Sequence, residues 1–199
     1  KKFIFLNNLQ PGVNKKFKKD ILNIIISKSG NTLETITNLN TQKINNNCIF
    51  ITEKKNNYLR KIAEKMKCEI VEHKNYIGGR YSVLSEVGML PAELMGLNEK
   101  KFKQFNYLIN NKKFINNLIN NVEGILQCVK KGKTNSIILN YDEDSQSFFY
   151  WYQQLVAESL GKKKNGIFPM ISSMPKDNHS LMQLYLDGPK NNFFTFFYV

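Results

Sequence analysis

The sequence predicts an α/β protein in which parallel β-strands alternate with α-helices. Short apolar runs of strand length recur along the chain, among them Ile24–Ile26, Cys48–Thr52 and Ser136–Leu139. Between these runs, apolar residues recur every three or four positions, as they do on one face of a helix. Strands joined by helices usually lie parallel, with right-handed crossovers. This alternation favours parallel sheets flanked by helices.

The first half of the chain is expected to alternate strand and helix from its start. Apolar runs predict strands at Phe3–Leu6, Ile21–Ile26, Cys48–Thr52 and Glu69–Glu72. The segments between them predict helices at Val13–Lys19, Leu33–Asn40 and Asn57–Lys67. The last helix has the clearest pattern, because Leu59, Ile62, Ala63 and Met66 recur on one side of it.

Helices are expected to fill the middle of the chain, at Tyr81–Leu94 and Phe102–Lys130. Pro91 should kink the first helix or mark a boundary, and Asn110–Lys113 is expected to interrupt the second. Strands are then predicted at Ser136–Leu139, Ile167–Ile171 and Phe193–Val199, and helices at Ser147–Leu160 and His179–Leu186. We therefore expect two domains, 1–98 and 99–199, with a second α/β unit starting near residue 135.

Composition places the chain among globular proteins. Of its 199 residues, 42% are hydrophobic and 23% are charged. No apolar run approaches the roughly 20 residues that span a bilayer, and no secretory signal is recognisable. The cysteines Cys48, Cys68 and Cys128 are widely spaced and form neither a metal-type pair nor a disulfide framework, so a reducing cytoplasm is the simplest setting. Because the chain starts at Lys1 and stops within an apolar strand, we expect a fragment of a longer protein.

The net charge of +13, from 29 Lys and Arg against 16 Asp and Glu, raises the hypothesis of nucleic-acid binding. However, Arg60 and Arg80 are the only arginines, and the lysines are scattered in pairs among many asparagines. This pattern indicates a general enrichment in lysine and asparagine along the chain and not a localised basic patch, so we expect no nucleic-acid partner. A small anionic substrate would benefit equally from such a positive field.

The segment Ser27-Lys28-Ser29-Gly30-Asn31-Thr32 joins an expected buried strand to the start of an expected helix. Exposed N–H groups and the positive end of the helix dipole favour an anion there. Ser27, Ser29 and Thr32 add hydroxyl donors, and Lys28 adds positive charge. The segment has neither the Walker spacing nor a GxGxxG turn. A phosphate monoester suits this chemistry, and the alternative interpretation is an ordinary capped helix.

Three further segments carry candidate chemistry. Gly78-Gly79-Arg80 predicts a tight turn that projects a guanidinium, which is suited to an oxyanion; the alternative is a plain turn with a surface arginine. Gln154 and Glu158 share one face of a helix, so Glu158 is either a candidate base or a solvated carboxylate. Asp177 or Asn178 is a good N-cap, which places His179 in the first turn of a helix, as a proton carrier or without any chemical role.

Taken together and in this order, the four segments strongly resemble the glucose-6-phosphate isomerase (phosphoglucose isomerase) family. The resemblance covers nearly the whole chain and rests on Ser27–Thr35, Gly78–Gly88, Gln153–Ser159 and Asp177–Ser180. The Gly-Gly-Arg segment is close to a family signature. Other phosphosugar-binding domains carry versions of the Ser27–Thr32 segment, which we call the serine-rich loop. The resemblance implies flavodoxin-like sugar-isomerase (SIS) domains with parallel sheets flanked by helices, here two partial domains.

The resemblance also implies the activity and the roles of individual residues. The family converts glucose 6-phosphate and fructose 6-phosphate through a cis-enediol, in glycolysis and gluconeogenesis, as a homodimer with shared active sites and without a cofactor or metal. The residues that would bind substrate are Ser27, Lys28, Ser29, Thr32, Gly79 and Gln154. Arg80 would stabilise the enediolate, Glu158 would move the proton, and His179, reaching in from the partner subunit, would assist ring opening.

A rival hypothesis is a non-catalytic SIS-type phosphosugar-binding regulatory module. Such a module shares the serine-rich loop but does not need Arg80, Glu158 and His179 together. Neither hypothesis involves a membrane.

Overall fold

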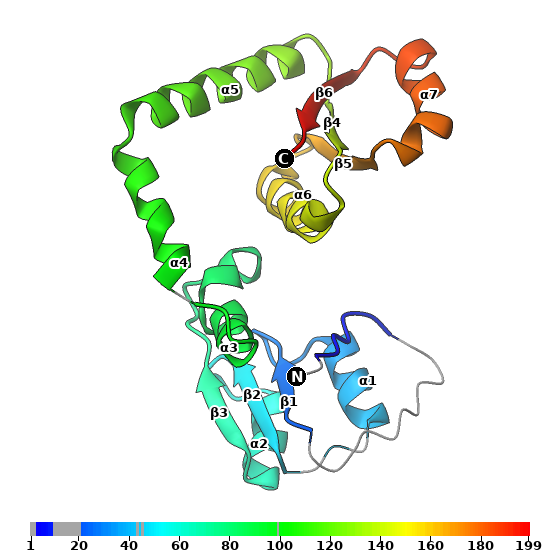
Figure 1. Ribbon diagram of the computed structural model, residues 1–199. Helices are drawn as coiled ribbons and strands as arrows, with labels where there is room; N and C mark the ends of the chain where they lie inside the picture. The colour runs from blue at the N-terminus through cyan, green and yellow to red at the C-terminus, as the bar shows by residue number, and fades with distance from the viewer. Residues whose placement is uncertain (1–2, 10–20, 43, 45, 99) are drawn as a thin grey trace. The chain divides into compact units, whose positions relative to one another are not determined.

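A computed structural model describes residues 3–9, 21–42, 44, 46–98 and 100–199 of the chain. The chain divides into two compact units, residues 1–103 and 104–199. Each unit contains its own three-stranded parallel sheet with helices beside it (Figure 1). The predicted α/β class with parallel sheets is therefore confirmed. None of the helices in the described residues is both long and apolar enough to cross a membrane.

The sheet of the first unit has the strand order β1-β2-β3, from Asn23–Ile26, Cys48–Thr52 and Glu69–Glu72. In the register of the sheet, Ile25 lies beside Phe50, and Phe50 lies beside Ile70. The helix α1 (Leu33–Thr41) connects β1 to β2, and α2 (Tyr58–Met66) connects β2 to β3. Both are crossover helices, as the order of the sequence segments predicts.

The core of the first unit lies between this sheet and its helices. Phe50 of β2 and Leu59 and Ala63 of α2 are fully buried, and Ile25, Leu39 and Cys48 belong to the same cluster. Leu59 and Ala63 are four residues apart, so one face of α2 supplies both contacts. The predicted amphipathic face of this helix is thus the face that packs on the sheet.

After β3 the first unit continues in helical segments. A 3₁₀ helix, η1 (Gly79–Leu84), is followed by α3 (Glu86–Leu94) and the short α4 (Lys100–Lys103). Ser85 separates η1 from α3, and its hydroxyl caps α3 by accepting a hydrogen bond from the amide of Val87 at 3.4 Å. Of the two expectations for Pro91, a kink or a boundary, the boundary is excluded, because α3 continues through this residue. The break lies at Ser85, where a capping side chain is available.

The second unit begins with the 3₁₀ helix η2 (Gln104–Asn110) and the long helix α5 (Lys112–Lys130). The side chain of Asn111 caps α5 by accepting a hydrogen bond from the amide of Phe114 at 3.1 Å. The predicted interruption at Asn110–Lys113 is therefore confirmed, and its physical cause is this cap.

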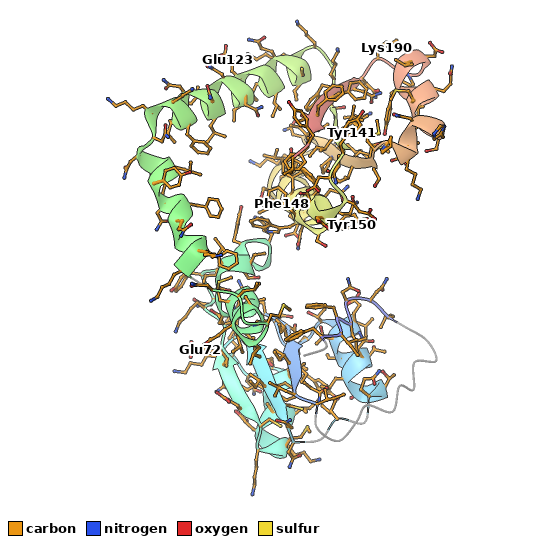
Figure 2. The ribbon with its side chains drawn as sticks, viewed as in Figure 1. Glu72, Glu123, Tyr141, Phe148, Tyr150 and Lys190 are labelled. Carbon is orange, nitrogen blue, oxygen red and sulfur yellow. The ribbon has the colours of Figure 1, made fainter. Side chains whose placement is uncertain are left out.

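The sheet of the second unit has the order β5-β4-β6, with β4 (Asn135–Asn140) in the centre, β5 (Phe168–Ser173) and β6 (Asn192–Phe197). The helix α6 (Gln146–Leu160) follows a short 3₁₀ turn, η3 (Glu143–Ser145), and buries Phe149 against Phe197 at a ring-centroid distance of 4.8 Å. On either side of Phe149 in the sequence, Phe148 and Tyr150 are exposed (Figure 2). The turn η4 (Lys176–His179) and the helix α7 (Met182–Asp187) lie between β5 and β6.

The structure corrects two further sequence predictions. Phe3–Leu6 is not a strand: its backbone forms no ladder with the described sheet, and Phe5 is 68% exposed. An apolar run becomes a strand only where a neighbouring strand pairs with its backbone. His179 does not lie in the first turn of an α-helix, because it ends the 3₁₀ turn η4 and α7 begins at Met182. The helix predicted at Val13–Lys19 lies outside the described residues.

Candidate functional site

The serine-rich loop joins the end of β1 to the start of α1, as the sequence predicts. Thr32 is the N-cap residue of α1, and its hydroxyl lies 2.7 Å from that of Ser27. The amide of Gly30 donates to the Ser27 hydroxyl at 3.2 Å, and the amide of Asn31 donates to that of Ser29 at 3.2 Å. The loop thus gathers three hydroxyl groups at a helix N-terminus, where the first amides lack partners within the helix.

The conformation of this loop depends on Gly30 and on the start of α2. Gly30 has a φ of +65°, and a Cβ atom built on it would lie 1.9 Å from Oδ1 of Asn57. Asn57 is buried and caps α2 by accepting a hydrogen bond from the amide of Arg60 at 2.9 Å. Its own amide group donates to the hydroxyl of Thr52 at 3.1 Å. Only a residue without a side chain fits between this asparagine and the loop.

Lys28 connects the serine-rich loop to the segment that leads into the Gly-Gly-Arg turn. Its ammonium group donates to the carbonyl oxygens of Asn75, at 2.9 Å, and Ile77, at 2.7 Å. The same group lies 3.5 Å from the carboxylate of Glu53, whose side chain is only 10% exposed. These contacts place the positive charge beside the loop and also cross-link two segments far apart in the sequence.

The Gly78-Gly79-Arg80 segment forms the start of η1. The amide of Tyr81 donates to the carbonyl of Gly78 at 2.9 Å, and the hydroxyl of Ser82 donates to the carbonyl of Gly79 at 2.6 Å. The guanidinium carbon of Arg80 lies 4.8 Å from the centroid of the Tyr81 ring, within cation–π distance. Arg80 is half-buried, so the turn holds its guanidinium against the protein surface.

An open cavity of about 560 Å³ adjoins this turn. Residues on both sides of Arg80 line it, including Lys74, Ile77, Gly78, Tyr81 and Glu86. The lining combines an aromatic ring and aliphatic side chains with charged groups of both signs. This cavity belongs to the first unit alone.

In the second unit, the predicted base lies near the C-terminal end of α6. Gln154 and Glu158 are exposed, and the amide of Gln154 donates to Oε1 of Glu158 at 2.8 Å. The predicted shared helical face is thus present, and the hydrogen bond orients the carboxylate. The α6 helix ends at Leu160, two residues beyond Glu158.

His179 is exposed and is the last residue of η4, a turn after β5 that Asp177 organises. One carboxylate oxygen of Asp177 accepts hydrogen bonds from the hydroxyl of Ser172 at 2.9 Å and from the amide of Ser173 at 2.8 Å. Its other oxygen lies 3.4 Å from the hydroxyl of Ser180. Asp177 therefore acts in a turn and not as an α-helix cap.

Within the first unit, the structure brings Ser27, Lys28, Ser29 and Thr32 into one loop and links this loop to the segment that carries Gly79 and Arg80. Within the second unit, it joins Gln154 to Glu158. Sequence reasoning missed Glu53 and Asn57, which support the loop, and His73 and Glu86, which lie beside the Arg80 turn. Asn57 could have been found as an N-cap before an amphipathic helix, whereas His73 carries no sequence signal.

Comparison with known proteins finds relatives of this chain among the glucose-6-phosphate isomerases. A glucose-6-phosphate isomerase from Methanocaldococcus jannaschii is 39% identical over 86% of this chain and 46% of its own length. One from Campylobacter jejuni is 32% identical over 98% of this chain and 52% of its own length. The chain thus spans about half the length of these relatives.

A hypothetical protein from Thermus thermophilus with a known crystal structure has a similar fold. The two structures match with a TM-score of 0.79 at 23% sequence identity, over 98% of this chain and 52% of that one. At the level of sequence, the family model described as phosphoglucose isomerase matches residues 7–172, which is most of the chain. The chain belongs to the phosphoglucose isomerase family.

Proposed function

We propose that the natural protein that carries this chain interconverts glucose 6-phosphate and fructose 6-phosphate through a cis-enediol intermediate. The observation that carries the proposal is the link between two motifs: Lys28 of the serine-rich loop donates to the carbonyl of Ile77, three residues before Arg80. The serine-rich loop, whose chemistry suits a phosphate, is thereby connected to an arginine suited to an oxyanion. The relatives from M. jannaschii and C. jejuni, which are named glucose-6-phosphate isomerases, supply the substrate.

In this proposal the serine-rich loop holds the phosphate group of the sugar. The hydroxyls of Ser27, Ser29 and Thr32 and the first amides of α1 donate hydrogen bonds to the phosphate oxygens. The ammonium of Lys28 adds positive charge beside them. Gly79 lets the backbone of the turn approach the sugar, because it has no side chain and nothing lies within 4 Å of a Cβ placed there.

The proton transfer is assigned to Glu158. Its carboxylate takes the proton from C2 of open-chain glucose 6-phosphate, and the electron pair of that bond forms the C1–C2 double bond of the enediolate. The guanidinium of Arg80 stabilises the negative charge that develops on the oxygen of C1. The proton of the C2 hydroxyl passes to the oxygen on C1, and Glu158 returns the carbon-bound proton to C1 as the C2 carbonyl of the ketose forms. The hydrogen bond from Gln154 orients the carboxylate and leaves the amide close enough to position the sugar.

The remaining elements of the proposal come from the family resemblance. His179 assists ring opening from the partner subunit of a homodimer, and the protein works in the cytoplasm in glycolysis and gluconeogenesis. The proton transfer described above uses only side chains of the protein, so it calls for no cofactor, metal or nucleic acid.

The test is a coupled assay of fructose 6-phosphate conversion with the natural protein that carries this chain. Glu158→Gln should lower kcat by roughly 10²- to 10⁴-fold, because a general base contributes about that much. Binding of fructose 6-phosphate, measured by calorimetry, should change little, since the phosphate loop is intact.

Glu123→Gln is a matched control, because Glu123 is an exposed residue of α5 that accepts a hydrogen bond from Gln127 at 3.3 Å (Figure 2). It should keep the activity of the unmodified protein. Near-normal turnover in Glu158→Gln would refute the assignment of the base. Sugar-phosphate binding without any turnover in the unmodified protein would favour the regulatory module instead.

A further inference from the structure

We propose that the pair formed by the buried His73 and the half-buried Glu86 is a positioning device that holds the Gly78-Gly79-Arg80 turn in place for catalysis. The inference rests on the proposed function and adds two residues to it. Neither residue is assigned a part in the proton transfer.

His73 is anchored to the sheet at its backbone. It follows β3 directly, its amide donates to the carbonyl of Thr52 at 2.9 Å, and its side chain is only 1% exposed. The imidazole therefore extends from a rigid part of the first unit. A buried imidazole needs partners for its ring nitrogens, and both are provided nearby.

The two partners of the His73 ring lie on either side of the Arg80 turn in the sequence. Nδ1 pairs with the carboxylate of Glu86, the first residue of α3. Nε2 lies 3.2 Å from the carbonyl oxygen of Ile77. The ring thus joins the end of β3 to the start of α3, so the two ends of the segment 74–85 are held together.

The carbonyl of Ile77 is the point where this pair meets the serine-rich loop. It accepts a hydrogen bond from Lys28 at 2.7 Å and lies within hydrogen-bond distance of His73. The peptide that leads into Gly78 is therefore held from two directions. Because Arg80 lies three residues further on, a shift of this peptide would move the guanidinium.

Stability alone gives a weak reason for such a pair. Burying a charged or polar pair costs desolvation that its attraction often only offsets. Fixing the geometry of a neighbouring catalytic group gives a stronger reason, because a displacement of about 1 Å can cost about 10²-fold in rate.

The test compares variants of Glu86 in the natural protein that carries this chain. Glu86→Ala removes the acceptor and should lower kcat on the order of 10- to 100-fold, with KM for fructose 6-phosphate changed less than about twofold. Glu86→Gln keeps an acceptor oxygen at the same reach and should restore most of kcat. Glu93→Ala is the control, because Glu93 is exposed on the same helix, and it should leave both constants unchanged.

Hydrogen exchange of the amides of residues 78–82 gives a readout that needs no turnover. These amides should exchange faster in Glu86→Ala than in the unmodified protein or in Glu93→Ala. If Glu86→Ala does not fold, Glu86→Asp takes its place in the comparison. The aspartate keeps a carboxylate at the start of α3, but its shorter side chain does not reach as far.

The possible results separate this inference from the proposed function. An inactive unmodified protein would refute the proposed function, and the exchange measurement would then decide whether the pair holds the turn. An active protein in which Glu86→Ala leaves kcat and exchange unchanged would overturn the inference alone. A Glu86→Gln variant as impaired as Glu86→Ala would overturn it as well, because the acceptor would then not be the relevant feature.

Discussion

Replacing Gly30 by alanine should destabilise the first unit far more than the same change at another glycine of the same backbone conformation. Gly30 and Gly96 both have a positive φ, +65° and +84°. At Gly96 nothing lies within 4 Å of an added Cβ, whereas at Gly30 the Cβ would lie 1.9 Å from Oδ1 of Asn57. The two variants therefore share the conformational cost and differ in the clash.

The expected difference follows from the contacts of Asn57. A non-glycine residue in the left-handed region costs about 1–2 kcal/mol, which both variants incur. Displacing Asn57 also removes the N-cap of α2, which is worth about 1 kcal/mol. It further breaks the bonds of its amide to Thr52 and to the carbonyls of Glu53 and Lys55, and a buried group left unpaired costs about 1–3 kcal/mol. Gly30→Ala should thus exceed Gly96→Ala by roughly 2–4 kcal/mol.

Urea unfolding followed by two signals measures this difference and locates it. Circular dichroism reports both units, whereas the fluorescence of Trp151, the only tryptophan, reports α6 of the second unit. The shift in Gly30→Ala should appear in the first signal and be absent from the second. Michaelis constants should also rise in Gly30→Ala, because the serine-rich loop moves with Gly30.

A double-mutant cycle with Asn57→Ala provides the refutation. When Asn57 is already absent, Gly30→Ala should cost only the conformational term of about 1–2 kcal/mol. If the full cost persists in that background, or if Gly30→Ala is no more destabilising than Gly96→Ala, the clash with Asn57 is not the cause of the destabilisation.

Two further predictions concern Cys48 and Asp177. Burial, and secondarily the neighbouring Cys68 thiol, raises the pKa of Cys48 from 9.0 to about 11. Alkylation of this thiol near neutral pH should therefore be much slower in the folded protein than in urea, and equal rates would contradict the assignment. Because the pKa of Cys48 is higher in the folded chain, the contribution of the buried neutral thiol to the free energy of unfolding is fully present below pH 9.0. This contribution is lost as the pH rises toward about 11, and urea midpoints measured across this interval test the loss. Asp177→Ala should lower the urea midpoint of Trp151 fluorescence by the equivalent of about 1–3 kcal/mol, because the Ser173 amide and the Ser172 hydroxyl lose their acceptor; an unchanged midpoint would contradict this role.

The sequence by itself determined the fold class and most of the elements. β2 and β3 have the predicted bounds, and α1 extends only one residue beyond its prediction. Local signals suffice for these elements, because apolar periodicity and capping residues act over a few positions. The serine-rich loop and the pairing of Gln154 with Glu158 are local for the same reason. The roles of the candidate site residues stay predictions until the variants above are measured.

Only the tertiary structure decided which segments meet. Phe3–Leu6 has the composition of a strand, yet strand formation depends on a partner elsewhere in the chain. Lys28 donates to a carbonyl oxygen 49 positions away in the sequence, and Asn57 fills the space beside Gly30. His73 pairs with Glu86, which lies on the other side of the Arg80 turn in the sequence. No periodicity encodes such contacts, because they depend on how the sheet and its crossover helices bring distant backbone together.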